Sequence, residues 1–124
     1  MSGDDADKPP EGAGENPPEP RGLQLDRTSR QVWVDGVPRP QRLTKSQIKL
    51  LRFLGSRRDE VCPRKDTVWE VYGNVYVPQV DDGRLDAMVE RTRRKIEENP
   101  RKPRFLLTVR AVGHRLNEYL GERR

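Results

Sequence analysis

The alternation of hydrophobic and polar residues in the first part of the chain predicts short strands. In "LQLD", which begins at Leu23, and in "RQVWVDG", which begins at Arg30, apolar residues alternate with polar ones at the two-residue period of a half-buried strand. The dipeptide Asp35-Gly36 is typical of a hairpin turn. The segment "QRL" at residues 41–43 has the strand pattern as well. Together these segments predict a small antiparallel N-terminal sheet.

After this region the hydrophobic spacing changes to that of helices. Thr44 and Gln47 match a capping box, and the apolar positions that follow predict a helix over residues 45–55. A second helix is predicted over residues 64–72, and the connection 73–82 is predicted to be a loop because it holds a proline. The residues of the second helix that we expect to face the core are Val68, Trp69, Val71 and Tyr72.

The longest helical pattern and a terminal hairpin complete the fold. A helix is predicted over residues 84–98, with one buried stripe formed by Leu85, Met88, Val89, Thr92 and Ile96. The segment "RFLLTVRAVGHRL" predicts two strands and a tight turn with Arg110 at its tip. This order predicts an α+β winged helix-turn-helix fold, with an N-terminal antiparallel sheet, a three-helix bundle and a C-terminal hairpin wing. The predicted anchors of the wing are Phe105, Leu107, Val109, Val112 and Leu116.

Charge divides the chain into two unequal parts. Six acidic residues and one lysine give the first 20 residues a net charge of −5, and since the whole chain carries +5, the rest carries +10. We expect residues 1–21 to be a disordered acidic tail or linker, 22–120 to be the folded domain and 121–124 to be a flexible C-terminus. A basic domain indicates a polyanionic partner, most often nucleic acid, although charge can also serve solubility alone.

Motifs for catalysis are absent from the sequence, so we predict neither an enzyme nor a cofactor or metal site. The single histidine, His114, lies in the hairpin pattern, and Ser46 and Cys62 have no base pattern beside them. The pair Asp81-Asp82 is explained by the favourable position of acids at a helix N-terminus. One cysteine and the lack of an apolar run or signal segment favour a cytoplasmic protein without membrane or small-molecule partners.

The third predicted helix is dense in basic residues. On a helix in a major groove such residues contact base edges and phosphates, but they also form solvated faces with pairs such as Glu90–Arg94. The hairpin favours the first interpretation, because Arg110 at its tip cannot pack in a core and would reach a neighbouring minor groove. The clustered basic residues are Arg91, Arg93, Arg94 and Lys95.

Three segments, "LTKSQIKLLRFL", "VWEVYG" and "LDAMVERTRRKIEENPRKPRFLLTVRAVGHRL", resemble the OmpR/PhoB-type winged-helix DNA-binding domain of bacterial response regulators in two-component systems. The resemblance covers about residues 23–118. It implies sequence-specific binding of double-stranded DNA by a transcriptional regulator, with recognition helix 84–98 in the major groove and wing 108–114 in the adjacent minor groove. The DNA contacts that it implies are Arg64, Ala87, Arg91, Arg93, Arg94, Thr108 and Arg110.

The resemblance also implies protein partners. Loop 73–82 corresponds to the segment that touches RNA polymerase in some family members, and its candidate residues here are Asn74, Tyr76 and Gln79. A DNA-dependent homodimer is implied as well. Because members usually carry a receiver domain that this chain lacks, we expect either the effector half of a larger protein or a free-standing effector domain.

Four positions depart from the family pattern. Glu90 stands where members carry a small, polar or basic residue; it would repel phosphate, but it could accept from the N4 amine of a cytosine. Thr92 replaces a buried leucine. Ala111 and His114 replace the glycine and tyrosine of the wing; the histidine is either a neutral packed ring or a pH switch. The alternative function is therefore a protein–protein interaction module with weakened DNA binding, which would contact RNA polymerase or a regulatory partner.

Overall fold

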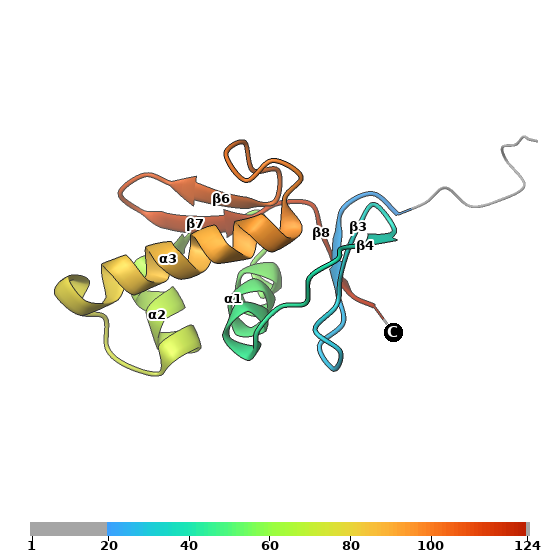
Figure 1. Cartoon of the computed structure of the whole chain (residues 1–124). Coiled ribbons are helices and arrows are strands. Elements are labelled where there is room, and N and C mark those ends of the chain that lie inside the picture. Colours follow the sequence, from blue (N-terminus) through green and yellow to red (C-terminus); the bar gives the residue numbers. More distant parts are fainter. Residues whose placement is uncertain (1–19, 124) are drawn as a thin grey trace, which may run out of the picture.

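The computed structural model describes residues 20–123 and arranges them as two small sheets around three helices (Figure 1). Most of the predicted acidic tail, residues 1–19, lies outside the described residues. Three short strands come first, followed by a helix, a two-residue strand and a second helix. A long third helix, a hairpin and a last strand complete the order.

The N-terminal sheet contains one strand from the end of the chain. Strands β2 (Leu23–Leu25), β3 (Val32–Val34) and β4 (Val37–Pro38) pair antiparallel in sequence, and β8 (Tyr119–Glu122) runs parallel to β2. The predicted flexible C-terminus over 121–124 is therefore wrong in part, because Gly121 and Glu122 belong to β8. Only one large apolar residue, Leu120, accompanies Tyr119 in "YLGE", so the strand pattern is too short to be recognised.

The predicted strand at 41–43 is also wrong. The turn at Asp35-Gly36 joins β3 directly to the strand that pairs with it, so the third strand is Val37–Pro38 and not residues 41–43. Leu43 is buried, and its N–H donates to the Arg30 carbonyl at 2.9 Å without continuing a ladder. Its apolar side chain, rather than strand pairing, explains the pattern.

The first two helices form as predicted. Helix α1 (Lys45–Ser56) begins with a capping box in which Thr44 and Gln47 each accept the backbone N–H of the other. Helix α2 (Arg64–Tyr72) ends at Gly73, whose φ of 77° is in the left-handed region that favours glycine. Trp69 does not join the core as expected but is 56% exposed, because it lies about 100° around the helix from the buried Val68.

Helix α3 (Pro78–Ile96) begins earlier than the predicted residue 84 and ends before residue 98. Much of the predicted loop 73–82 is thus helical. Proline is compatible with the first turn of a helix, and the carboxylate of Asp81 accepts the Val77 N–H at 2.7 Å. The predicted stripe of Leu85, Met88, Val89, Thr92 and Ile96 is buried, so the periodicity prediction is confirmed.

The second sheet carries the predicted hairpin. Strands β6 (Leu106–Val109) and β7 (Gly113–Leu116) pair antiparallel, and β5 (Cys62–Pro63) pairs with the other side of β7. Gly113 permits this approach, since a Cβ there would collide with the Cys62 carbonyl oxygen. Val112 is 48% exposed and does not anchor the hairpin as predicted, because it lies in the turn; Leu106, paired with Leu116, is buried instead.

Helix α3 runs along the β6–β7 hairpin, and α1 and α2 lie below α3 in the view of Figure 1, with α1 also in contact with β7. One continuous core joins these elements to the N-terminal sheet. Three helices followed by a β-hairpin make the architecture a winged helix, as predicted. Within residues 20–123, no helix is both long and apolar enough to cross a membrane.

Candidate nucleic-acid interface

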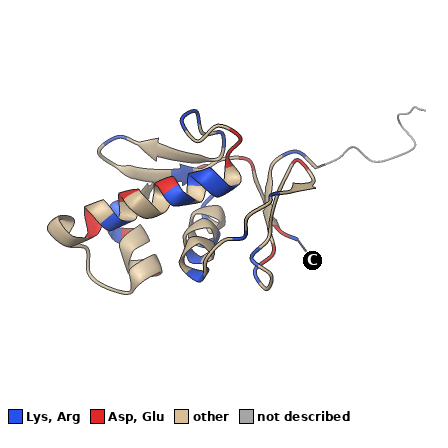
Figure 2. Cartoon of the chain, viewed as in Figure 1, with Lys and Arg blue, Asp and Glu red and all other residues tan. Residues whose placement is uncertain are grey.

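Helix α3 divides into two halves of opposite charge. Acidic residues are spaced along its N-terminal half, and basic residues gather in its C-terminal half (Figure 2). The buried stripe holds the helix against the core, and the Thr92 hydroxyl inside this stripe donates to the Met88 carbonyl at 2.7 Å. Since this hydroxyl is satisfied, threonine is accommodated where the family pattern has leucine.

The outward side of the C-terminal half presents two arginines to solvent. Arg91 is exposed and makes no hydrogen bond or ion pair with another described residue. The Arg94 guanidinium lies 3.3 Å from the Glu90 carboxylate, but both side chains remain more than 60% exposed, at 67% and 63%. Ala87, on the same side one turn earlier, is half-buried and small. This side can therefore approach a polyanion closely.

Arg93 joins α3 to the hairpin. Its Nε donates to the Leu106 carbonyl at 2.9 Å and its Nη2 donates to the Thr108 hydroxyl at 2.6 Å. The side chain is half-buried, and burial lowers the pKa of Arg93. Two residues predicted to contact DNA thus contact each other, and their contact fixes the hairpin relative to the helix.

Arg64, at the start of α2, is also engaged within the protein. Its guanidinium donates to the Asp82 carboxylate at 2.8 Å and to the Asp86 carboxylate at 2.9 Å, and its side chain is 21% exposed. Both acids belong to the N-terminal half of α3. The contact of Arg64 with a phosphate stays a prediction, and in this structure the residue connects the first turn of α2 to α3.

The hairpin tip presents Arg110 on a turn that includes a strained alanine. Arg110 is exposed and has no ion pair among the described residues. Ala111 has a φ of 66°, and the Val112 N–H donates to the Val109 carbonyl at 3.0 Å, which closes the turn. The turn therefore forms although alanine replaces glycine, at a conformational cost of about 1–2 kcal/mol.

His114 lies on the inner side of the hairpin and is 1% exposed. Burial, followed by the positive charges of Arg64 and Arg93, lowers the pKa of His114 to about 4. The ring is therefore neutral near pH 7, as expected for a packed aromatic residue. Its Nδ1 has no hydrogen-bond partner among residues 20–123.

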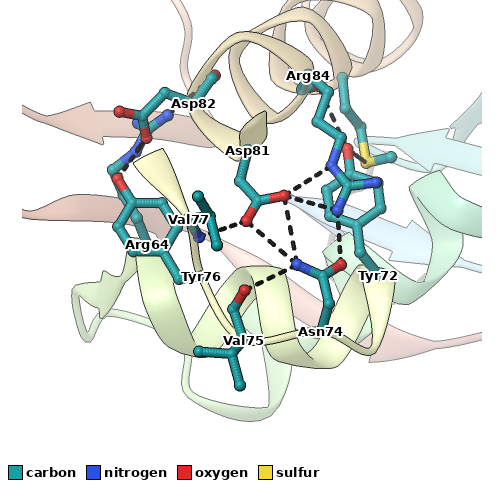
Figure 3. A network of polar contacts seen from close by, with 10 residues as sticks. Arg64, Tyr72, Asn74, Val75, Tyr76, Val77, Asp81, Asp82 and Arg84 are labelled. Carbon is teal, nitrogen blue, oxygen red and sulfur yellow. Dashed lines mark hydrogen bonds and ion pairs between the residues drawn. The ribbon is translucent and has the colours of Figure 1, made fainter. Parts of the chain in front are cut away.

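A network of polar contacts holds the connection between α2 and α3 (Figure 3). Asp81 is fully buried and accepts hydrogen bonds from the Val77 N–H, from Asn74 and from Arg84, whose closest nitrogen is 2.6 Å away. The hydrogen bond from Val77 is the main reason that the pKa of Asp81 is lowered. The predicted loop residues Asn74 and Tyr76 take part in such contacts, Tyr76 through Asp82, whereas Gln79 is exposed.

Two contacts that position the interface were missed in the sequence. The buried carboxylate of Glu97 accepts the N–H groups of Arg104, Phe105 and Leu106 at 2.7, 3.0 and 2.8 Å. An acid is unfavourable at a helix C-terminus, so a buried role was not expected there. Glu97 thereby fixes the start of β6 relative to the end of α3.

Arg104 connects the hairpin to the N-terminal sheet. Its two terminal nitrogens each donate to the Asp35 carboxylate at 2.8 Å, and Glu118 accepts from the same guanidinium at 2.9 Å. The hydrogen bonds from Arg104 lower the pKa of Asp35 to about 2. Arg104 lies between the end of a predicted helix and the start of a strand. Neither the 3.6-residue repeat of helices nor the two-residue repeat of strands indicates a partner for a residue at this position.

Comparison with known proteins agrees with this geometry. A family model described as "Transcriptional regulatory protein, C terminal" matches residues 39–116, which include all three helices and the hairpin. The chain belongs to this family. Its OmpR/PhoB type, which the sequence motifs indicated, is confirmed by the structural relatives.

The curated relatives are longer than this chain and match it over only part of their length. A probable transcriptional regulator, ycf27 of Cyanophora paradoxa, is 35% identical over 92 residues, which are 74% of this chain but 38% of that protein. The chain thus spans well under half the length of this curated relative.

Solved structures have the same fold. The response regulator DrrB of Thermotoga maritima, an OmpR/PhoB homologue, has a TM-score of 0.62 at 26% identity, over 77% of this chain and 42% of that one. The DNA-binding domain of Klebsiella pneumoniae RstA, in complex with its RstA box, has a TM-score of 0.65 at 24% identity, over 78% and 92% of the two chains. At that identity the second comparison supports the fold alone.

Proposed function

We propose that residues 22–120 bind double-stranded DNA sequence-specifically, as the DNA-binding part of a bacterial transcriptional regulator. Helix α3 lies in the major groove, and the β6–β7 turn reaches the adjacent minor groove. The observation that carries this proposal is the pair of unengaged cations: Arg91 on α3 and Arg110 at the hairpin tip are both exposed, with no ion pair to another described residue. Family membership supports it independently.

The other predicted contact residues take different roles. Arg94 lies on the DNA-facing side with Arg91, and Ala87 leaves room for the base edges. Arg93 and Thr108 hold the hairpin beside the helix, and their remaining donors are available to phosphates. Arg64 positions α3 through its carboxylate partners.

The salt dependence of DNA binding tests this arrangement. Arg91→Ala and Arg110→Ala should each weaken binding to a selected DNA and lower the slope of log affinity against log salt by about one for a lost phosphate contact. The matched control is Lys49→Ala, because Lys49 borders a hollow lined only by residues of α1 and α2. Unchanged affinity in both arginine variants would exclude this geometry.

A second candidate function is contact with a protein, and one observation favours it. The α2–α3 connection and the adjoining turns of both helices expose apolar side chains near the predicted polymerase-contact residues Asn74, Tyr76 and Gln79 in the sequence. Exposed apolar clusters mark protein interaction sites. These side chains are Trp69, Val75, Val77 and Val80, with exposures of 56%, 74%, 43% and 63%.

Reconstituted transcription with RNA polymerase tests this contact. Val75→Ser should reduce stimulation of a target promoter at saturating regulator, because the apolar contact is lost, while DNA affinity stays the same. Arg91→Ala should have the opposite pattern, with loss of affinity and normal stimulation once DNA is saturated. Full stimulation by the Val75 variant would exclude polymerase contact through this residue.

Two copies are proposed to bind together on DNA, as the family resemblance implies. Sedimentation should show one copy in free solution and two copies on DNA that carries two adjacent half-sites. One bound copy on such DNA at saturating protein would exclude the pairing.

A further inference from the structure

Glu90 is an acidic residue in the middle of a basic, outward-facing surface. In α3, the buried Val89 faces the core, and the next residue, Glu90, lies toward solvent together with Ala87 and Arg94. Its side chain is 63% exposed. A carboxylate at this place opposes the phosphates that the neighbouring arginines attract, so its presence needs a compensating contact if this face binds DNA.

The partner of Glu90 in the free protein does not hold it firmly. Only Oε2 contacts Arg94, at 3.3 Å, and Oε1 accepts no hydrogen bond from the described residues. Exposed pairs at this spacing contribute little stability. Both side chains are therefore free to exchange this contact for groups of a ligand.

The chemistry of the major groove limits what Glu90 can contact. An ionised carboxylate only accepts hydrogen bonds. The donors on base edges there are the N4 amine of cytosine and the N6 amine of adenine, and the adenine amine lies beside the N7 acceptor of the same base. An acceptor is repelled by N7 but has no such neighbour on cytosine, so the carboxylate favours cytosine.

We propose that Glu90 is a specificity-determining residue that selects a cytosine in the DNA target, with Arg94 on a nearby guanine. This inference rests on the proposed DNA binding. Four residues rise about 6 Å along a helix and bases rise about 3.4 Å per step, so the guanine lies within about two steps of the cytosine. Arginine bonds guanine O6 and N7 with two parallel hydrogen bonds.

Selection from random double-stranded DNA with the complete chain tests the assignment. The wild type should enrich one position for cytosine about tenfold over the other bases. Glu90→Ala should abolish the preference at that position only. Glu90→Gln should shift it to adenine, because a glutamine amide pairs with both N6 and N7.

Glu70→Gln is the matched control, because it removes the same charge from an exposed site on α2 outside α3. It should raise general affinity without changing the selected sequence. Arg94→Ala should lose the nearby guanine. A preference at the Glu90 position for adenine in the wild type, or one selected sequence for wild type and both Glu90 variants, would overturn the proposal while leaving DNA binding intact. Absence of any selected sequence would reject the proposed function itself.

Discussion

The two halves of α3 use charged residues in opposite ways. In the N-terminal half, Asp81 and Asp82 are bound to Arg84 and Arg64, and Asp81 is completely buried. In the C-terminal half, Arg91 has no partner among the described residues and the pairing of Arg94 is exposed to solvent. Arginines are present in both regions, so their number does not locate a DNA-binding surface. Within α3, the half proposed to bind DNA differs from the other in that Arg91 has no carboxylate partner among the described residues and the partner of Arg94 is exposed.

Removal of Asp81 should produce the largest effect, and it should affect stability. Asp81→Ala leaves the Val77 N–H, Asn74 and Arg84 without their shared acceptor. Because this buried carboxylate is the shared acceptor of three groups, we expect the urea midpoint of unfolding to fall by about 1 M or more. Denaturation followed by circular dichroism measures the change.

Arg91→Ala is the counterpart in the other half. Since this side chain is exposed and forms no ion pair within residues 20–123, its removal should leave the urea midpoint nearly unchanged while it weakens DNA binding. If Arg91→Ala destabilises the fold as much as Asp81→Ala does, the two halves do not differ in the way described.

A second effect should appear at His114, whose pKa depends on Arg93 of the C-terminal half of α3 and on Arg64 of α2, the partner of Asp82. Arg64 and Arg93 add to the effect of burial in lowering the pKa of His114 from 6.5 to about 4. Between these values the unfolded chain binds more protons than the folded one. The stability that depends on the neutral ring is therefore complete above pH 6.5 and is lost as pH falls toward 4, by about 2 kcal/mol at pH 5.

Urea unfolding at pH 8 and pH 5 measures this contribution. His114→Leu has no titrating ring, so its loss of stability between the two pH values should be smaller by about 2 kcal/mol, whatever its absolute stability. Equal pH dependence in the variant and the wild type would mean that His114 is protonated in the folded hairpin.

The sequence predicted the elements that have a clear period. The buried stripe of α3 follows the 3.6-residue repeat, and the β6–β7 hairpin follows alternation on both sides of a turn. The start of α3 at Pro78 was missed because proline was interpreted as a loop signal, although a proline at the first position and an acid in the first turn are both compatible with a helix start. Strand β8 was missed because its partner, β2, lies at the opposite end of the chain.

For the site, the residue types were predictable but their partners were not. The family resemblance implies that Arg64, Arg93 and Arg110 contact DNA, which stays a prediction. The sequence does not indicate that Arg64 meets two carboxylates or that Arg93 meets Thr108, because these contacts join different elements. Pairing within one helix, as in Glu90–Arg94, was predicted because it depends on helical geometry alone.

A smaller effect is expected at the hairpin tip. Ala111→Gly should stabilise the protein by about 0.5–1 kcal/mol, because relief of the left-handed strain at a φ of 66° exceeds the added entropy of the unfolded chain. Thermal unfolding measures this gain. Gly73→Ala is the matched reverse change, at a φ of 77° with open space around it, and should destabilise. A destabilising Ala111→Gly would mean that the turn depends on contacts of the alanine methyl group.

The smallest effect on DNA binding is expected at Arg64. This residue tests whether an arginine that is held by carboxylates of the N-terminal half of α3 contributes to DNA binding. Arg64→Gln removes a cation that is already satisfied by Asp82 and Asp86. The salt slope of DNA binding should therefore stay the same, whereas Arg91→Ala lowers it by about one. Affinity should fall only slightly, because the two carboxylates lose their neutralising partner.

Asp86→Asn separates the two roles that Arg64 can have. In the free protein this change removes one of the two carboxylates that hold the guanidinium. If Arg64 only positions α3, the salt slope remains that of the wild type in both variants. A slope that falls by one in Arg64→Gln and is retained in Asp86→Asn would show that the guanidinium leaves its carboxylates for a phosphate when DNA binds, and that the N-terminal half of α3 opens to take part in the interface.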